Sequence, residues 1–224
     1  NSSCGSMPVP WDRCKPMSNP EQDALVARTI DHYSASAEAF WEGTKDHDVE
    51  QNRAALLDEL EGDGPFAILD VGCGPGRDLA YFSGLGHEAV GVEGAEEMAR
   101  IARERTGCEV LQQNFLSLDL PKGHFDGIFA NASLFHVPKS ALPRVLGELC
   151  ASLKNRGVLF SSNPRGENVE AMNGERFCVL HDFAAWRAFV TAAGFEEIRH
   201  YYRPDGKPRA EQPWLASVWR RIQI

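Results

Sequence analysis

A glycine-rich turn between an apolar strand and a helix is the feature that most constrains the fold. The segment LDVGCGPGRDLA, residues 69–80, is apolar up to Asp70 and passes through three glycines at alternate positions into a helical pattern from Arg77. A P-loop would need a lysine and a Ser or Thr after its glycines, and neither follows here. A plain turn does not need three glycines and a proline. The turn therefore predicts an α/β unit whose backbone closely approaches a bound molecule.

The rest of the chain alternates strands and helices. The predicted strands are 66–71, 88–93, 109–113, 125–131 and 157–162, and the predicted helices between and after them are 77–85, 95–106, 142–153 and 182–193. Two final strands, 196–202 and 214–222, are joined by too little chain for a helical crossover, which favours antiparallel neighbours. We predict an α/β fold with a doubly wound, mostly parallel seven-stranded sheet whose last strand is antiparallel.

The N-terminal part is predicted to consist of a tail and two helices. Residues 1–18 are rich in Ser, Pro and Gly without periodicity, so we interpret them as a linker or tail and place one domain at 19–224. Asn19-Pro20-Glu21-Gln22 has the features of a helix start, and apolar positions continue the helix to Trp41. A second helix is predicted at 49–60. We expect these helices to cover the site.

Composition excludes several classes of partner. The formal net charge is -9, whereas nucleic-acid and acidic membrane surfaces usually require clustered Lys and Arg. No apolar run reaches the roughly 18 residues of a transmembrane helix. The six cysteines form no C-x-x-C pair and have no His at zinc spacing, which indicates no metal site and a reducing cytoplasm.

The G-x-G-x-G spacing after Asp70, with Glu93 at the end of the next strand, resembles the class I S-adenosylmethionine-dependent methyltransferases. A nicotinamide site would have its third glycine one position later. The resemblance implies that the glycines admit the methionine portion of S-adenosylmethionine, Asp70 lies near its amino group, and Glu93 accepts from the ribose hydroxyls. Asn114 and Phe115 would flank the adenine; the family often has Asp at the first of these positions, and an amide oxygen can replace its carboxylate. The implied cofactor-binding residues are Asp70, Gly72, Gly74, Gly76, Arg77, Glu93, Gly94, Asn114, Phe115 and Asn131.

A nucleobase substrate is excluded by a second pattern. DNA and RNA amino-methyltransferases carry Asn-Pro or Asp-Pro after their fourth strand, where this chain has Asn131-Ala132. Its Asn163-Pro164 follows the fifth predicted strand instead. We therefore expect a small-molecule substrate.

Further segments resemble the C-terminal methyltransferase domain of ovothiol synthase, over about residues 24–221. The segments are 40–52, 130–136, 161–168, 201–204 and 212–219. The resemblance implies methylation of 5-thiohistidine on the imidazole nitrogen nearer the side-chain stem, which gives ovothiol A and S-adenosylhomocysteine. In the family's larger proteins this domain is joined to an iron-dependent sulfoxide synthase, so such a domain, linked or separate, is the expected partner.

Candidate substrate residues follow the strands, because ligands in open α/β sheets bind beyond the carboxyl ends of the strands. The catalytic candidates are Asn131 and His136, and the substrate-binding candidates are Tyr33, His47, Asn52, Ser133, Asn163, Arg165 and Arg176. Structural roles remain open for several: His136 as a packing residue and Arg165 as a surface arginine. Three functional alternatives also remain: methylation of another small thiol, amine or carboxylate metabolite, a non-catalytic cofactor-binding module, and a nicotinamide-dependent reductase.

Overall fold

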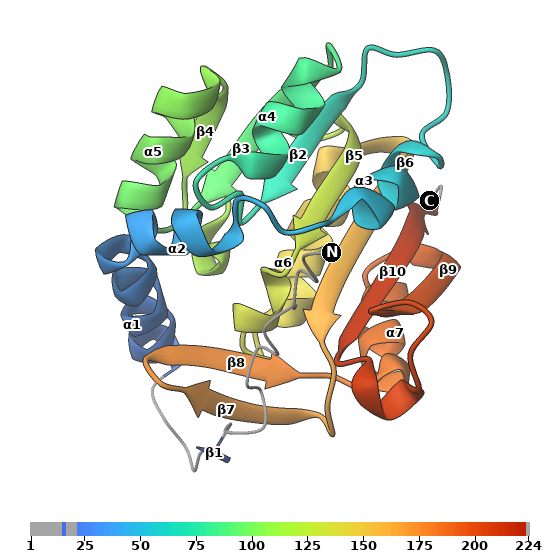
Figure 1. Ribbon diagram of the computed structural model, residues 1–224. Helices are drawn as coiled ribbons and strands as arrows, with labels where there is room; N and C mark the ends of the chain where they lie inside the picture. The colour runs from blue at the N-terminus through green and yellow to red at the C-terminus, as the bar shows by residue number, and fades with distance from the viewer. Residues whose placement is uncertain (1–14, 17–21, 223–224) are drawn as a thin grey trace, which may run out of the picture.

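Seven strands form one twisted sheet in the computed structural model, which describes residues 15–16 and 22–222 (Figure 1). The strand order is β4-β3-β2-β5-β6-β10-β9. Their bounds are Ala67–Val71 for β2, Glu88–Glu93 for β3, Glu109–Gln112 for β4, Phe125–Asn131 for β5, Leu153–Pro164 for β6, Phe195–Arg203 for β9 and Trp214–Arg221 for β10. Strand β10 pairs antiparallel with both β6 and β9, and the other pairs in this sheet are parallel. The predicted sheet, with its last strand antiparallel, is confirmed.

Helices pack on both faces of this sheet, as predicted for a doubly wound fold. On one face lie α3 (Glu50–Leu57), α4 (Arg77–Gly84) and α5 (Glu96–Thr106), and on the other α6 (Leu142–Ser152) and α7 (Phe183–Ala192) (Figure 1). Successive residues of a strand point to opposite faces. In β5, Ile128 therefore packs into the core beneath α6 and α7, while Phe129 packs into the core on the side of α3 and α4. Short 3-10 helices at Phe115–Ser117 (η2), Leu134–His136 (η3) and Arg209–Glu211 (η4) complete the loops.

The N-terminal cover consists of three helices where two were predicted. The expected helix to Trp41 is divided at Ser36 into α1 (Gln22–Ala35) and α2 (Ala37–Thr44). The Ser36 hydroxyl donates to the His32 carbonyl at 2.7 Å, and this local bond competes with the helical pattern. The Asp48 carboxylate accepts from the Glu50 amide at 3.1 Å just before α3, whose N-cap residue is Val49. The helix start expected at residues 19–21 lies outside the described residues.

A hairpin that the sequence interpretation missed closes the carboxyl end of the sheet. Strands β7 (Val169–Asn173) and β8 (Arg176–Leu180) pair antiparallel through a two-residue turn, and Gly174 has the positive φ of +61° that such turns need. Figure 1 shows the hairpin lying across the end of the sheet and reaching α1. The two residues of β1, Lys15–Pro16, pair with β7, so part of the expected tail belongs to this small sheet.

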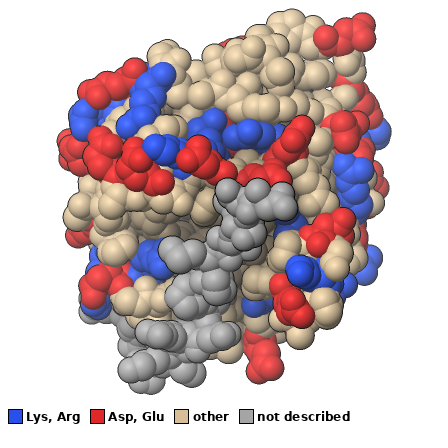
Figure 2. Space-filling model, in the orientation of Figure 1, with Lys and Arg blue, Asp and Glu red and all other residues tan. Residues whose placement is uncertain are grey.

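The surface agrees with the charge argument on the face shown in Figure 2. There, Lys and Arg side chains alternate with Asp and Glu, and no separate basic area stands out. Among the described residues, no helix is both long and apolar enough to span a bilayer.

Candidate functional site

The glycine turn is a close-packed loop between β2 and α4. Gly72, Gly74 and Gly76 all have positive φ, at +71°, +52° and +92°, which residues with a side chain rarely adopt. A Cβ atom on Gly72 would lie 2.4 Å from the Ser133 Cβ, so the loop after β5 packs directly on the glycine backbone. Glycine is therefore required at Gly72 for both conformation and space, and the neighbour that requires the space is Ser133.

The Glu93 carboxylate ties the end of β3 to this loop. One oxygen accepts from the Gly74 amide at 2.9 Å and the other from the Ala95 amide at 2.8 Å. Burial raises the pKa of Glu93, and these backbone donors oppose the rise. Each carboxylate oxygen has a second lone pair, so Glu93 can still accept a pair of hydroxyl groups. This chemistry fits the ribose role that the family resemblance implies.

Asp70, at the end of β2, carries a buried oxygen without a partner. The residue is 3% exposed, and its Oδ2 atom makes no hydrogen bond with any residue that the structure describes. Burial, with a smaller contribution from the nearby Asp78 carboxylate, raises the pKa of Asp70 well above its usual value. A cation brought close to Asp70 would relieve this cost, so the site fits the ammonium group of an amino-acid-like ligand.

Other expected cofactor residues surround the loop with different contacts. The Asn114 Oδ1 atom accepts from the Leu116 backbone amide at 2.9 Å. The NH2 group of the Asn114 side chain is therefore the group best able to contact a ligand, whereas the sequence had suggested its oxygen. The Phe115 ring lies 3.3 Å from the position of a Cβ on Gly72. A Cβ on Gly94 would lie 3.1 Å from Ile30 of α1, so this helix presses on the turn after β3.

Arg77 holds the cover helices. Its Nη2 atom donates to the Asp78 carboxylate at 2.7 Å and its Nη1 atom to the Thr44 carbonyl at the end of α2, at 3.0 Å. Asp78 also pairs with Arg53 of α3 at 2.6 Å. In the ligand-free chain, Arg77 therefore joins α4 to the cover.

Tyr33, His136 and Arg176 meet beneath α1. The His136 Nδ1 lies 2.5 Å from the Phe177 carbonyl, so that nitrogen carries the proton and Nε2 accepts from the Tyr33 hydroxyl at 3.0 Å. Burial lowers the pKa of His136 to about 4. Arg176 of β8 donates to the Tyr33 oxygen at 3.5 Å. Three segments far apart in sequence thus bring a neutral imidazole, a phenol and a guanidinium together.

A second chain of hydrogen bonds joins α3 to the end of β5. The Asn52 Nδ2 atom donates to the Asn131 Oδ1 atom at 2.9 Å, and the Tyr201 hydroxyl donates to the Asn52 Oδ1 atom at 2.9 Å. Two of these residues were site candidates. Tyr201 was not, because alternation on a strand indicated only a core or rim position and no local pattern marks a hydroxyl that reaches another element.

The remaining candidates divide into buried and peripheral residues. Ser133 and Asn163 are 4% and 1% exposed, and their side-chain polar atoms have no partner within the described parts of the chain. Arg165 donates to the carbonyls of Gln212 and Arg209, which holds the loop before β10. His47 is exposed in the turn after α2. Ser133 and Asn163 thus remain site candidates, whereas Arg165 and His47 lie in connecting loops.

The comparisons with known proteins agree with this architecture. Residues 68–157 match the family model of the methyltransferase domain. With the strand order of its sheet, the chain has the Rossmann-like class I methyltransferase fold. The match extends from β2 into β6 and so includes the glycine loop and Glu93, and the cofactor of this family is S-adenosylmethionine.

Two curated methyltransferases match parts of this chain. The 24-methylenesterol C-methyltransferase 2 of Oryza sativa subsp. japonica is 32% identical over 164 residues, which cover 64% of this chain and 43% of the relative. The trans-aconitate 2-methyltransferase of Azoarcus sp. (strain BH72) is 36% identical over 120 residues, 52% of this chain and 47% of the relative. The chain thus spans less than half the length of these two curated relatives.

Among solved structures, the 1,6-didemethyltoxoflavin-N1-methyltransferase of Burkholderia thailandensis has the same fold. Its TM-score is 0.75 at 24% identity, with 93% of each chain covered, and it holds 1,6-didemethyltoxoflavin and S-adenosylhomocysteine. In this methyltransferase domain, the unpartnered Asp70 oxygen, the glycine cradle and the Glu93 carboxylate fit S-adenosylmethionine.

Proposed function

We propose that the domain transfers a methyl group from S-adenosylmethionine to an imidazole ring nitrogen of 5-thiohistidine, forming ovothiol A. The observation that carries the proposal is a pair of polar groups at the carboxyl end of the sheet: Arg176 of the β7–β8 hairpin bonded to Tyr33 of α1, and Asn131 at the end of β5 bonded to Asn52. These side chains offer a cation and polar hydrogens to a small zwitterionic molecule. The resemblance to the ovothiol synthase domain adds the identity of that molecule.

Recognition of the amino-acid carboxylate is assigned to Arg176. A guanidinium has five N–H donors in a planar fork, so it can donate to Tyr33 and still bind a carboxylate. Its place on β8 puts it on the hairpin that closes the carboxyl end of the sheet (Figure 1). The Ser133 side chain, on the loop after β5, and the Asn163 side chain, near the end of β6, have no partner among the described residues and are assigned to the polar remainder of the substrate.

Cofactor binding is assigned to the glycine loop, Asp70, Glu93, Asn114 and Phe115. Bound S-adenosylmethionine supplies an activated methyl group on sulfur; the ring nitrogen forms the new bond, the C–S pair stays on sulfur and the ring proton passes to water. Such a displacement depends on positioning the nucleophile about 3 Å from the methyl carbon. The chain contributes the position of the nucleophile in preference to a strong base.

His136 supports this interpretation as an orienting residue. Its Nδ1–H is committed to the Phe177 carbonyl and its Nε2 to Tyr33, and its pKa of about 4 makes it a weak base near neutral pH. His136 therefore keeps the Tyr33 hydroxyl in place, and Tyr33 in turn supports Arg176. Nitrogen methylation is also compatible with the fold, because the Burkholderia thailandensis protein is an N1-methyltransferase.

The domain is proposed to span residues 19–224 and to act in a reducing cytoplasm with a sulfoxide synthase domain, linked or separate, as its partner. Methylation of another small thiol, amine or carboxylate metabolite is the second candidate, since the curated relatives include a trans-aconitate 2-methyltransferase. Both candidates use the same cofactor site.

Mass spectrometry of the purified protein with S-adenosylmethionine and 5-thiohistidine tests the proposal, with histidine as the control substrate. We expect one added methyl on the thiohistidine ring, located by fragmentation, and none on histidine. Methylation of a different metabolite in a panel of thiols, amines and carboxylates, with none on thiohistidine, would replace the substrate assignment. Binding of S-adenosylhomocysteine without turnover of any panel member would favour a non-catalytic module.

A further inference from the structure

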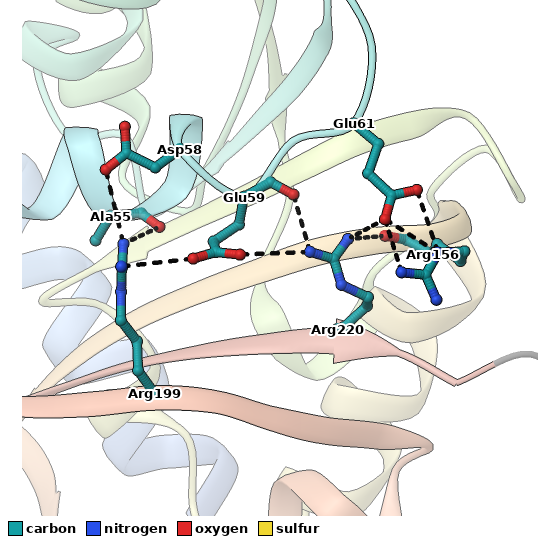
Figure 3. Close-up of polar contacts among 7 residues, drawn as sticks. All are labelled: Ala55, Asp58, Glu59, Glu61, Arg156, Arg199 and Arg220. Carbon is teal, nitrogen blue, oxygen red and sulfur yellow. Dashed lines mark hydrogen bonds and ion pairs between the residues drawn. The ribbon is translucent and has the colours of Figure 1, made fainter.

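One face of the strand β9 holds the helix α3 along its length. Alternate residues of a strand share a face, and on this face Arg199 donates to the Ala55 carbonyl at 3.4 Å while Arg203 donates to the Asp48 carbonyl at 3.0 Å. Figure 3 shows Arg199 reaching the end of α3 from β9. Tyr201 lies between these two arginines in the same row, so its side chain meets the middle of the helix.

At that middle position, Tyr201 meets a buried amide of α3. Its hydroxyl donates to the Asn52 Oδ1 atom at 2.9 Å, and Asn52 is 2% exposed. An asparagine whose oxygen accepts from a hydroxyl must present its NH2 group on the other side. The Asn52 NH2 group accordingly donates to the Asn131 Oδ1 atom at 2.9 Å.

The bond between Asn52 and Asn131 fixes the orientation of the Asn131 side-chain amide. Because the Asn131 oxygen faces Asn52, its Nδ2 hydrogens remain available at the carboxyl end of β5, the end at which open α/β sheets bind ligands, and no hydrogen bond from Nδ2 occurs in the described part of the chain. An amide turned the other way would present an acceptor there. The two orientations would select opposite groups on a bound molecule.

We infer that Tyr201 is a positioning residue: through Asn52, its hydroxyl turns the Asn131 amide so that N–H donors face a lone-pair-bearing atom of the methyl acceptor. The inference rests on the proposed function for the presence of a small polar acceptor. It adds that the recognised atom is a hydrogen-bond acceptor, such as the thiolate or a carboxylate oxygen of a thiohistidine.

The Tyr201 hydroxyl remains a donor over the working range of pH. Burial raises the pKa of Tyr201 to about 12, so the group keeps its proton from pH 7 to pH 9. Loss of the hydroxyl should therefore have the same effect at both ends of this range. A titrating group would give an effect that changes with pH.

Tyr201→Phe removes the hydroxyl and keeps the ring that packs on the core. The matched control is Tyr202→Phe, the neighbouring residue on the same strand, whose hydroxyl makes no hydrogen bond with the described residues. Three readouts are compared in wild type and both variants: hydrogen exchange of the Asn52 side-chain NH2 group by NMR, the Kd of S-adenosylhomocysteine by calorimetry, and the KM and kcat for the methyl acceptor at pH 7 and pH 9.

For Tyr201→Phe we expect faster Asn52 NH2 exchange, an acceptor KM raised about 5- to 10-fold at both pH values, and a Kd for S-adenosylhomocysteine within about twofold of wild type. Tyr202→Phe should match wild type throughout. Unchanged Asn52 exchange and KM in Tyr201→Phe would overturn the inference. So would a weakened Kd for S-adenosylhomocysteine with an unchanged KM, because the amide would then face the cofactor.

A failure of the proposed function is separable from a failure of this inference. If wild type methylates a different small molecule, KM is measured with that molecule and the expected change is the same. If wild type methylates nothing, the proposed function fails, and Asn52 exchange in the ligand-free protein still decides whether Tyr201 orders the amides. Equal Asn52 exchange in wild type and Tyr201→Phe would then reject the inference.

Discussion

The two parts of the N-terminal cover are attached to the sheet in different ways. Helix α3 buries Leu56 completely and is followed by a network of ion pairs, drawn in Figure 3, in which Glu59 and Glu61 meet arginines of β6, β9 and β10. Helices α1 and α2 are attached through a smaller apolar cluster with α5, in which Ile30 and Phe40 pack beside Met98, through exposed pairs such as Arg28 with Glu175, and through the Tyr33 hydroxyl.

This difference distinguishes α3, which is held firmly on the sheet, from α1 and α2, whose position depends on contacts with candidate site residues. Exposed ion pairs contribute about 0–1 kcal/mol each, whereas a charge that loses a buried partner costs several times more. The contacts that hold α1 most specifically are those of Tyr33 with His136 and Arg176, which are candidate site residues. We therefore expect α1 and α2 to respond to ligands and α3 to stay in place.

The largest expected effect is at Arg220, whose side chain is 11% exposed and donates to the carbonyls of Arg156 and Glu59. Arg220→Ala leaves these acceptors without partners and should lower the free energy of unfolding by about 3 kcal/mol, measured with urea. Arg28→Ala, at an exposed pair, should cost less than about 1 kcal/mol. Equal costs would show that the two parts of the cover are equally anchored.

Substitution of Asp70 should weaken cofactor binding whether or not the N-terminal helices change position. Asp70→Asn should raise the Kd of S-adenosylmethionine about 30-fold, or about 2 kcal/mol, because the ammonium group loses a buried anionic partner. Burial raises the pKa of free Asp70 and a bound cation lowers it, so wild-type affinity should increase as pH rises from 5.5 to 8.

The Asp70 variant itself provides the control for this pH dependence, because Glu93 titrates in both proteins. Calorimetry at several pH values should show the trend in wild type and a flatter profile in Asp70→Asn. A parallel pH dependence in the two proteins would assign the effect to another group.

Hydrogen exchange should distinguish the two parts of the cover directly. Phe40 of α2 lies 3.7 Å from the position of a Cβ on Gly74, so a ligand held by the glycine loop should stabilise α2 and α1. We expect S-adenosylhomocysteine to slow backbone exchange in α1 and α2 about 10-fold, with less than twofold change in α3. Mass spectrometry of peptic fragments measures this. Equal protection of all three helices would remove the distinction.

The smallest effect is a pH dependence of stability from His136. Its pKa of about 4 in the folded chain is below the ordinary value of 6.5, so the unfolded chain binds more protons as pH falls between these values. At pH 5.5 this should cost about 1.4 kcal/mol relative to pH 7.5. The raised pKa values of Asp70 and Glu93 make the folded chain more stable as pH falls, which opposes the effect of His136. The variant His136→Gln keeps both carboxyl groups and is therefore the reference protein.

Urea unfolding of wild type and His136→Gln at both pH values isolates the histidine, since the carboxyl groups are common to both proteins. Wild type should lose about 1.4 kcal/mol more than the variant between pH 7.5 and pH 5.5. The same loss in both would mean that His136 titrates normally, and the attachment of α1 through a neutral imidazole would have to be abandoned.

Local patterns account for the parts of the fold that were predicted. The strands of the parallel sheet are short apolar runs and the helices carry apolar stripes, both of which depend on neighbouring residues alone. The glycine loop was predicted for the same reason, since positive φ is a local requirement. Between β7 and β8, Asn173-Gly174 was an available turn signal, but the strands on either side are only five residues each and easily taken for loop.

The break at Ser36 shows where a local pattern misleads. Apolar spacing continues through this residue, whereas its backbone leaves the helical region, at φ −115° and ψ 15°, and divides the helix in two. Both halves still cover the site, so the predicted position of the N-terminal segment was useful even though its shape was wrong.

By itself, the sequence determined the alternating elements, the antiparallel last strand and the glycine loop with Asp70 and Glu93, because each follows from residues close together in the chain. Only the tertiary structure decided which side chains meet. Tyr33 reaches His136 across 103 residues, and Tyr201 reaches Asn52 across 149. Such contacts depend on how helices and strands pack across the sheet. Packing produces no repeating sequence pattern around a single hydroxyl or amide, so these contacts cannot be predicted from the sequence.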